Sequence, residues 1–216
     1  ASYSEASGNS QVVSDLVTGD VLEKVNENGS FYEVKYPSGT TAYIKKEEAK
    51  LYSEWVSALN PSEENLVSTS KSLMGLPYLW GGTSSKGVDC SGFTKTVYFL
   101  NGIVLPRDAS QQVHAGQLID TTRNFEKLIP GDLLFFGRKA TDSTSEKVVH
   151  VGMWIGNNQF IHSLGNVHTS SVDTTSTEFD EFNYNRYLRT KRILPDSDKL
   201  IRLSQSELYE KVAIKK

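Results

Sequence analysis

The chain has 216 residues, a mass of 24.0 kDa and a net charge of −3 at pH 7. Its 38% apolar and 23% charged residues are typical of a globular protein and not of a disordered one. The acidic balance argues against a general nucleic-acid binder. The longest wholly aliphatic or aromatic run, Leu133 to Phe136, is too short for a transmembrane segment, and a single cysteine excludes an internal disulfide and a four-cysteine zinc site.

The first ten residues are small and polar, which predicts a flexible lead-in. From Gln11 to about Tyr52, short apolar stretches alternate with turn signals, and this pattern predicts five short strands closed into a small barrel. The segment from Thr18 to Ile44 resembles a bacterial SH3-like domain, with Tyr43 and Ile44 where that family often has an aromatic–aliphatic pair. We therefore expect an SH3-like domain over residues 1–55.

A helix start follows the predicted barrel. Asn60 is the expected N-cap, Pro61 the first helical residue and Glu63 the capping-box acid. Gly75-Leu76-Pro77 should end that helix. The domain boundary is therefore predicted near residues 53–60, with a second domain over residues 60–195 and a C-terminal extension over residues 196–216.

The second domain is predicted to contain helices followed by strands, which makes an α+β fold. A helix should run from Cys90 to about Asn101 and end at Gly102. The strand candidates are Asp132–Phe136, Val148–Ile155, Gln159–Leu164 and Tyr187–Ile193. The polar residues Arg138–Lys147 are expected to form an exposed insertion between two strands.

The context of Cys90 indicates a nucleophile. A glycine-rich loop leads to Asp89, a good N-cap, so that Cys90 falls in the first turn of a helix. The backbone N–H groups and the helix dipole there favour a thiolate, whereas the neighbouring Asp89 carboxylate opposes it. A histidine partner would still be required, and the alternative is an inert, buried cysteine.

Two of the four histidines are candidate partners for Cys90. His150 and His162 lie on consecutive predicted strands joined by Gly156-Asn157-Asn158. If all three residues form the loop, the two histidines share a sheet face, whereas a two-residue loop would place them on opposite faces. On one face they suit a cysteine nucleophile, a base and an orienting group. A zinc site made by Cys90 and these histidines stays open as an alternative. His114 and His168 are expected at the surface.

Six blocks of sequence together resemble the NlpC family of cell-wall cysteine peptidases. They lie in the family's order within about residues 62–195: Leu76–Gly82, Asp89–Phe93, Leu105–Gln112, Pro130–Phe136, His150–Gly156 and Phe160–Ser163. The resemblance implies a papain-like α+β fold that hydrolyses peptidoglycan stem peptides, usually at the γ-D-glutamyl bond to a diamino acid. It assigns Cys90 as nucleophile, His150 as base and His162 as the third, polar member. It requires neither metal nor cofactor.

The resemblance also suggests substrate-binding residues. Tyr78 falls where the family places an aromatic hydroxyl beside the reacting carbonyl, and Trp80 is in the same block. Enzymes of this kind with an SH3-like domain often act on peptides with a free N-terminal L-alanine. We expect Asp89 and Tyr43 to bind that ammonium group, with contributions from the remaining candidates, Ser91, Asp108 and Ser110.

The expected partner is therefore a peptidoglycan stem peptide or muropeptide, and we expect a monomer. A chain that begins at Ala1 is expected to be a secreted mature form, located in a bacterial periplasm or cell envelope. Residues 186–216 contain nine Lys or Arg and four Asp or Glu, and this basic tail could face an anionic polymer or simply be solvated. Three alternatives remain: a thiol amidase or acyltransferase on the same fold, a wall-binding module, and an inhibitor-regulated toxin of the same chemistry.

Overall fold

The computed structural model describes residues 1–195 and 200–206. They fall into two compact units, residues 1–59 with Ser206 and residues 60–205. A helix, α1 (Tyr52–Ser57), occupies most of the segment predicted as a linker. The prediction missed this helix, in which the ring of Tyr52 packs edge-on against Trp55 at 5.9 Å between centroids.

The first unit is built on a five-stranded antiparallel sheet in the order β2-β1-β5-β4-β3. Its elements are β1 (Ser2–Tyr3), β2 (Val12–Ser14), β3 (Glu23–Asn28), β4 (Phe31–Lys35), β5 (Thr41–Lys45) and the short 3-10 helix η1 (Lys46–Glu48). Its small core consists of Val34, Ala42 and Ile44 with partly buried neighbours. The sequence pattern predicted five strands within residues 11–52, but only four, β2 to β5, lie there, and the fifth, β1, lies in the predicted lead-in. The SH3-like assignment stays a prediction.

The predicted flexible lead-in is wrong for β1. Ser2 is fully buried, and its hydroxyl lies 2.7 Å from the Tyr36 hydroxyl. Tyr3 pairs with both Val12 and Tyr43, so that β1 lies inside the sheet. A strand of two residues has too few side chains to show a period of two, and small polar composition alone indicated a loop.

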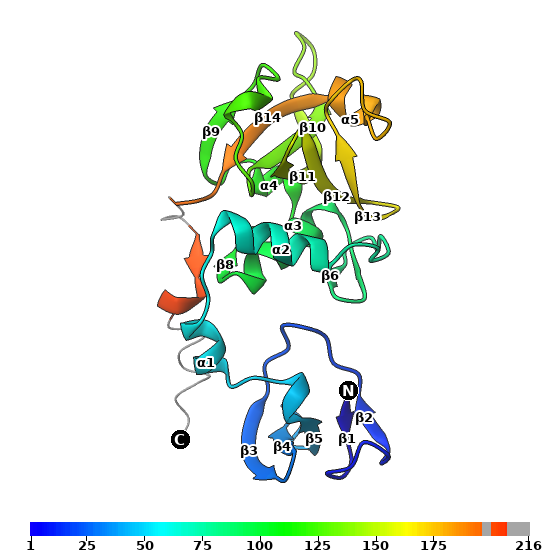
Figure 1. Ribbon diagram of the computed structural model, residues 1–216, viewed down its shortest axis with the longest axis vertical. Coiled ribbons are helices and arrows are strands. Elements are labelled where there is room, and N and C mark those ends of the chain that lie inside the picture. Colours follow the sequence, from blue (N-terminus) through cyan, green and yellow to red (C-terminus); the bar gives the residue numbers. More distant parts are fainter. Residues whose placement is uncertain (196–199, 207–216) are drawn as a thin grey trace. The chain divides into compact units, whose positions relative to one another are not determined.

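The second unit combines a six-stranded sheet with helices that pack against it (Figure 1). The helical elements are α2 (Glu63–Ser72), α3 (Cys90–Leu100), α4 (Ala109–Gln112), η2 (Phe125–Lys127), α5 (Glu181–Asn185) and η3 (Leu203–Gln205). The sheet has the order β13-β12-β11-β10-β14-β9, with antiparallel neighbours throughout.

The strands of this sheet are β9 (Gln117–Asp120), β10 (Leu133–Arg138), β11 (Lys147–Gly156), β12 (Gln159–Leu164), β13 (Asn166–Ser171) and β14 (Tyr187–Arg192). Two further pairs are β6 (Thr83–Ser84) with β7 (Gly87–Val88), and β8 (Ile103–Val104) with β15 (Ile201–Arg202). All four strands predicted for this domain are present, whereas β9 and β13 were not predicted.

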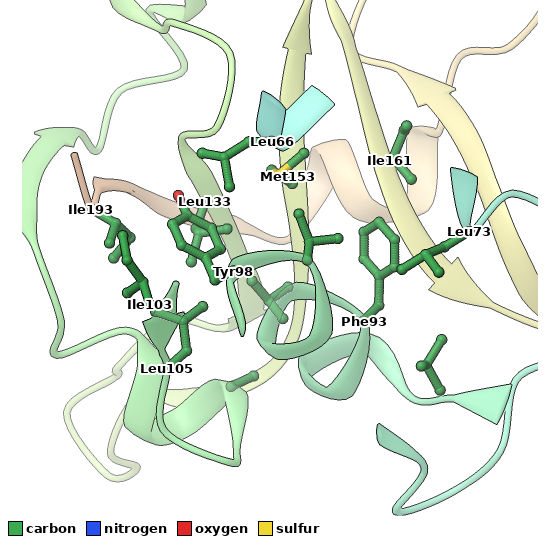
Figure 2. Packing of buried hydrophobic residues seen from close by; sticks show 14 of the residues in the cluster. Leu66, Leu73, Phe93, Tyr98, Ile103, Leu105, Leu133, Met153, Ile161 and Ile193 are labelled. Atoms are coloured by element: carbon green, nitrogen blue, oxygen red, sulfur yellow. The ribbon is translucent and has the colours of Figure 1, made fainter. Parts of the chain in front are cut away.

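The sheet separates two apolar clusters because successive strand residues point to opposite faces. On the α3 face, Leu133, Met153 and Ile161 belong to the main core together with Phe93 and Tyr98 of α3 (Figure 2). On the other face a second cluster consists of Leu128, Leu134, Phe136, Trp154, Phe160, Val172 and Tyr187. Helix α3 is thereby fixed against the sheet along its length, which positions its first residue, Cys90.

The start of α2 differs from the prediction. The N-cap is Ser62, whose hydroxyl accepts a hydrogen bond from the Asn65 N–H at 3.2 Å. Asn60 instead uses its carbonyl oxygen, which accepts from the Asn65 side chain at 2.7 Å. Both Asn60 and Ser62 are cap residues by type, so the sequence alone could not choose between them.

Part of the predicted C-terminal extension belongs to the second unit. Ile201 and Arg202 pair with Val104 and Ile103, and Leu203 is buried. Residues 196–199 and 207–216, which make up the rest of that extension, lie outside the described residues. Within the described ranges, no helix has the length and apolar content needed to span a bilayer.

Candidate active site

Cys90 is the first residue of α3, as predicted. The Asp89 side chain caps the helix and accepts a hydrogen bond from the Gly92 N–H at 2.7 Å. The loop that precedes α3 lies close against the first turn of the helix. A Cβ added at Gly92 would lie 1.9 Å from the Gly82 carbonyl oxygen. Only glycine therefore fits at position 92, and the turn holds Cys90 at a fixed, half-buried place.

Asp89 is the anchor of this turn. Arg107 donates to both of its carboxylate oxygens, at 3.1 and 2.5 Å, and the Gly81 N–H and the Ser91 hydroxyl donate at 3.0 and 3.2 Å. Burial raises the pKa of Asp89, but the hydrogen bonds from Arg107 and the backbone outweigh it, so the pKa lies below its usual value. Asp89 is thus ionised and surrounded by donors from the protein itself.

The Cys90 thiol lies beside β11. Burial and the Asp89 charge raise its pKa, whereas hydrogen bonds from the backbone N–H groups of Val151 and Ser91 act in the opposite direction. The contact with Val151 brings the sulfur to the strand that carries His150, the predicted base. At rest the site therefore favours a neutral thiol over a thiolate.

His150 and His162 share one sheet face, but by a different route from the one expected. The hairpin loop has two residues, Asn157 and Asn158, both with positive φ, and Gly156 pairs with Gln159. A bulge at Ile155 then shifts the register, so that Met153 pairs with Ile161. The extra residue of the bulge compensates for the shorter loop and returns the histidines to the same face.

The two histidines are in direct contact. His150 Nε2 lies 2.8 Å from His162 Nδ1, and both side chains are buried. Burial and the charge of His162 lower the pKa of His150 well below its usual value. Burial and the charge of His168 lower the pKa of His162 to about 3. Both rings are therefore neutral at physiological pH, and a histidine must be neutral to accept a proton as a base.

The structure adds His168 to this group, which corrects its prediction as a surface residue. Nε2 of His168 lies 3.1 Å from His162 Nε2, and the Ser170 hydroxyl lies 3.0 Å from the same atom. Asp180 is more distant, with a carboxylate oxygen 3.9 Å from His162 Nε2. The alternation of Val167, His168 and Thr169 was the available signal, but the strand is too polar to be recognised as β13.

Arg186 is a second residue that sequence reasoning placed elsewhere, in the basic tail. Its charge interacts with Cys90 and lowers the pKa of both His150 and His162. Asn183 holds the guanidinium through hydrogen bonds of 2.7 and 3.0 Å, and the exposed ring of Phe182 lies 4.0 Å below it. The cation thus belongs to the site.

The remaining predicted site residues occupy different environments. Tyr78 is half-buried, and its pKa is raised by burial and by the charges of Cys90 and Asp89, so its hydroxyl stays neutral. Trp80 is 86% exposed. The others are Ser91, which is buried against Asp89; Asp108 and Ser110, which are exposed at the start of α4; and Tyr43, which lies in β5 of the first unit.

The predicted insertion 138–147 is exposed along its whole length. A turn between Thr141 and Thr144 closes it, and Glu146 at its end binds Arg189 of β14 at 2.5 Å. Arg192 likewise pairs with Asp132 at 2.8 Å. These basic residues are therefore engaged by the protein's own carboxylates. Among the described residues, no group of three or more His, Cys, Asp or Glu side chains is arranged to hold a metal ion.

The chain is similar in sequence to known peptidases. The chain is 39% identical over 142 residues to a gamma-D-glutamyl-L-lysine dipeptidyl-peptidase of Bacillus cereus, a match that covers 66% of this chain and 40% of that protein. It is 33% identical to a probable endopeptidase NlpC homolog of Haemophilus influenzae, over 80% of this chain and 76% of that protein. The chain thus spans less than half of the Bacillus cereus relative.

A solved NlpC/P60 family protein from Bacillus cereus superposes with a TM-score of 0.65 at 34% identity, covering 81% of this chain and 54% of that one. The model of the NlpC/P60 family itself matches residues 75–189, which contain Cys90, His150 and His162. The resemblance seen in the sequence is therefore confirmed, and the chain belongs to the NlpC/P60 family.

Proposed function

We propose that this protein is a cysteine peptidase that hydrolyses peptidoglycan stem peptides at the bond between γ-D-glutamate and a diamino acid. The observation that carries the proposal is the placement of Cys90 at the start of α3, beside the strand of His150, which is itself 2.8 Å from His162. A thiol, a neutral base and a group that orients the base are the parts of a nucleophilic acyl-transfer site.

In the proposed reaction, His150 accepts the Cys90 proton as the sulfur attacks the amide carbonyl carbon. The C–N bond then breaks while His150 returns that proton to the leaving amine, and a thioester forms on Cys90. His150 next takes a proton from water, which attacks the thioester and releases a carboxylate and the free thiol. The proton transfer is coupled to attack because burial keeps both groups neutral at rest.

The negative oxygen formed during attack needs donors. The Cys90 N–H is one candidate, because the first N–H groups of α3 have no partner within the helix. The Tyr78 hydroxyl is the second, since burial and nearby charges raise its pKa and keep it protonated. The first donor belongs to the start of α3, and the second belongs to the segment that precedes this helix.

The proposal includes a preference for peptides with a free N-terminal L-alanine, and the names of relatives support cleavage at a γ-D-glutamyl bond. Two of them, from Bacillus cereus and Bacillus subtilis, are named gamma-D-glutamyl-L-lysine dipeptidyl-peptidases. The term dipeptidyl-peptidase denotes an enzyme that releases a dipeptide from a free N-terminus. Asp108, the residue after Arg107, presents a 63% exposed side chain, and one of its carboxylate oxygens lies 4.0 Å from the Arg107 guanidinium. Asp89 was also predicted to bind the ammonium, but its oxygens already accept from Arg107 and two backbone N–H groups. Asp108 is therefore the better candidate.

The site of action that we propose is the bacterial cell envelope or the wall fragments released from it. Mass spectrometry of defined muropeptides incubated with the protein tests the activity. We expect L-Ala-γ-D-Glu and the freed diamino-acid peptide, with one water added across the bond. Products joined to an added amine would indicate an acyltransferase. Release of ammonia or another simple amine would indicate an amidase. If the thiol is intact and no product forms, the protein is a binding module.

A further inference from the structure

Three neighbouring strands place their histidines in one row across the sheet. His150 lies in β11, His162 in β12 and His168 in β13, the strand at the sheet edge. His162 and His168 are directly opposite each other in the register of β12 and β13. The ring nitrogens are 2.8 Å apart between the first pair and 3.1 Å apart between the second.

The row of histidines ends at the Asn166 carbonyl oxygen, an atom that can only accept a hydrogen bond. Nδ1 of His168 lies 3.0 Å from the Asn166 carbonyl oxygen, so a neutral His168 carries its proton on Nδ1 and leaves Nε2 as an acceptor. His162 must then donate from Nε2, which leaves its Nδ1 unprotonated. His150 in turn donates from Nε2 to that Nδ1, and its own Nδ1 is left free.

We propose that His168 is a positioning residue that fixes the proton positions on His162 and His150, so that His150 presents an unprotonated nitrogen to Cys90. This inference rests on the proposed role of His150 as the base. With the opposite tautomer, His162 would carry a proton on Nδ1 and face the Nε2–H of His150. His150 would then have to move its proton to Nδ1 and could not accept the one from Cys90.

The other groups around His162 do not make this choice. The Ser170 hydroxyl, at 3.0 Å from Nε2, can donate or accept and therefore suits either tautomer. The Asp180 carboxylate is 3.9 Å away and accepts hydrogen bonds from the Asn183 backbone and side chain. Arg186 disfavours a second proton on either buried ring. His168 alone presents a nitrogen that is committed to accepting.

Nitrogen-15 NMR of histidine-labelled protein tests the assignment directly, and the chain has only four histidines to resolve. At about pH 8, above the ordinary histidine pKa, we expect the proton on Nδ1 of His168 and on Nε2 of both His162 and His150. A proton on Nε2 of His168, or on Nδ1 of His162, in the wild-type protein would overturn the proposal without any activity measurement.

Two variants connect the tautomers to catalysis. His168→Phe keeps a ring but removes the acceptor, so His162 should populate both tautomers and kcat should fall about tenfold with KM nearly unchanged. His168→Gln returns an acceptor oxygen and should keep kcat within about threefold. The same two substitutions at His114, which is exposed, are the matched controls and should leave kcat and the NMR signals of the other histidines unchanged.

A single wild-type tautomer of His162 in the phenylalanine variant would overturn the proposal, whatever its rate. So would mixed tautomers with a normal kcat. If that variant does not fold, the wild-type spectrum and the glutamine variant still decide. Failure of the proposed peptidase activity is separate, because it would appear as an inactive wild-type protein whose histidines nevertheless carry the expected protons.

Discussion

Arg107 holds the Asp89 carboxylate with two hydrogen bonds, immediately before Cys90, the proposed nucleophile. This ion pair fixes the loop that leads to Cys90, since the same carboxylate caps the helix and binds the Gly81 N–H. The Asp89 residue is only 8% exposed. An ion pair with such a buried partner stabilises the fold mainly because its loss leaves one charge unpaired.

We therefore expect Arg107→Gln to lower the free energy of unfolding by about 2–4 kcal/mol. The double variant Asp89→Asn with Arg107→Gln should recover part of this loss, because no buried charge is then left without a partner. Urea denaturation measures both, with Arg138→Gln as the control at an exposed arginine. Equal destabilisation by the single and double variants would show that Arg107 acts only through packing.

The second prediction concerns the nucleophile. Cys90→Ser should reduce hydrolysis by about 10³-fold or more, because an alcohol at this position is a much weaker nucleophile than the thiol. The melting temperature should change little, since the substitution alters one atom of a half-buried residue at the start of α3. Turnover and thermal unfolding measured on the same sample check both parts, and near-normal turnover of the serine variant would end the assignment.

The third prediction separates orientation from packing at His162. His162→Ala should lower kcat by about 10²-fold and change KM much less, because an orienting group acts mainly in the transition state. His162→Gln should keep more activity, since an amide oxygen can accept the hydrogen bond from His150. Steady-state kinetics on one defined peptide compare the variants. If alanine and glutamine give equal rates, His162 does not orient the base.

The pH dependence of stability follows from the buried histidines. The pKa of His162 is about 3 in the folded protein against an ordinary value of 6.5, so the unfolded chain binds more protons between these values. The part of the free energy of unfolding that depends on a neutral, buried His162 is complete above about pH 6.5 and decreases as the pH falls. Each such histidine should lower the free energy of unfolding by about 1.4 kcal/mol per pH unit in that window.

Urea denaturation at a series of pH values from 7 to about 4 tests this slope. His162→Gln has no ring to protonate and should show a shallower decrease than the wild type. The exposed His114 supplies the control, because His114→Gln should leave the slope unchanged. A wild-type slope equal to that of the His162 variant would contradict a buried, neutral His162.

Much of this site could be predicted from the sequence because its signals are local. The cap at Asp89, the helix that starts at Cys90 and the alternation around His150 depend on neighbouring residues alone. The common face of His150 and His162 was predicted for the wrong reason. The bulge at Ile155 that restores the register depends on packing across strands, which no local pattern encodes.

The residues that were missed depend on contacts distant in the chain. His168 reaches His162 only because β12 and β13 pair in one particular register. Arg186 follows α5, a helix of five residues whose pattern is too short to recognise. β1 is two residues long and gains its place from pairing with both β2 and β5. Such elements are determined by tertiary structure and not by their own composition.

The last prediction concerns the choice of substrate. If the peptide's free ammonium group is bound by a carboxylate beside the site, N-acetylation of L-Ala-γ-D-Glu-diamino-acid peptide removes that charge and adds bulk. Loss of one charged contact should cost about 2–5 kcal/mol, or at least about tenfold in kcat/KM. The free peptide, its acetylated form and intact sacculi should therefore be cleaved in decreasing order, as measured by mass spectrometry with time.

Two variants then identify the carboxylate. Asp108→Asn should reduce the preference for the free peptide, because the Asp108 side chain is exposed and its ion pair with Arg107 is long, at 4.0 Å. Asp89→Asn should leave the ratio between free and acetylated peptide unchanged even if it slows both, because its carboxylate is occupied by Arg107. Equal cleavage of the free and acetylated peptides by the wild-type protein would contradict recognition of the ammonium. That result would favour an endopeptidase acting on the intact wall, since stem peptides there carry no free N-terminus.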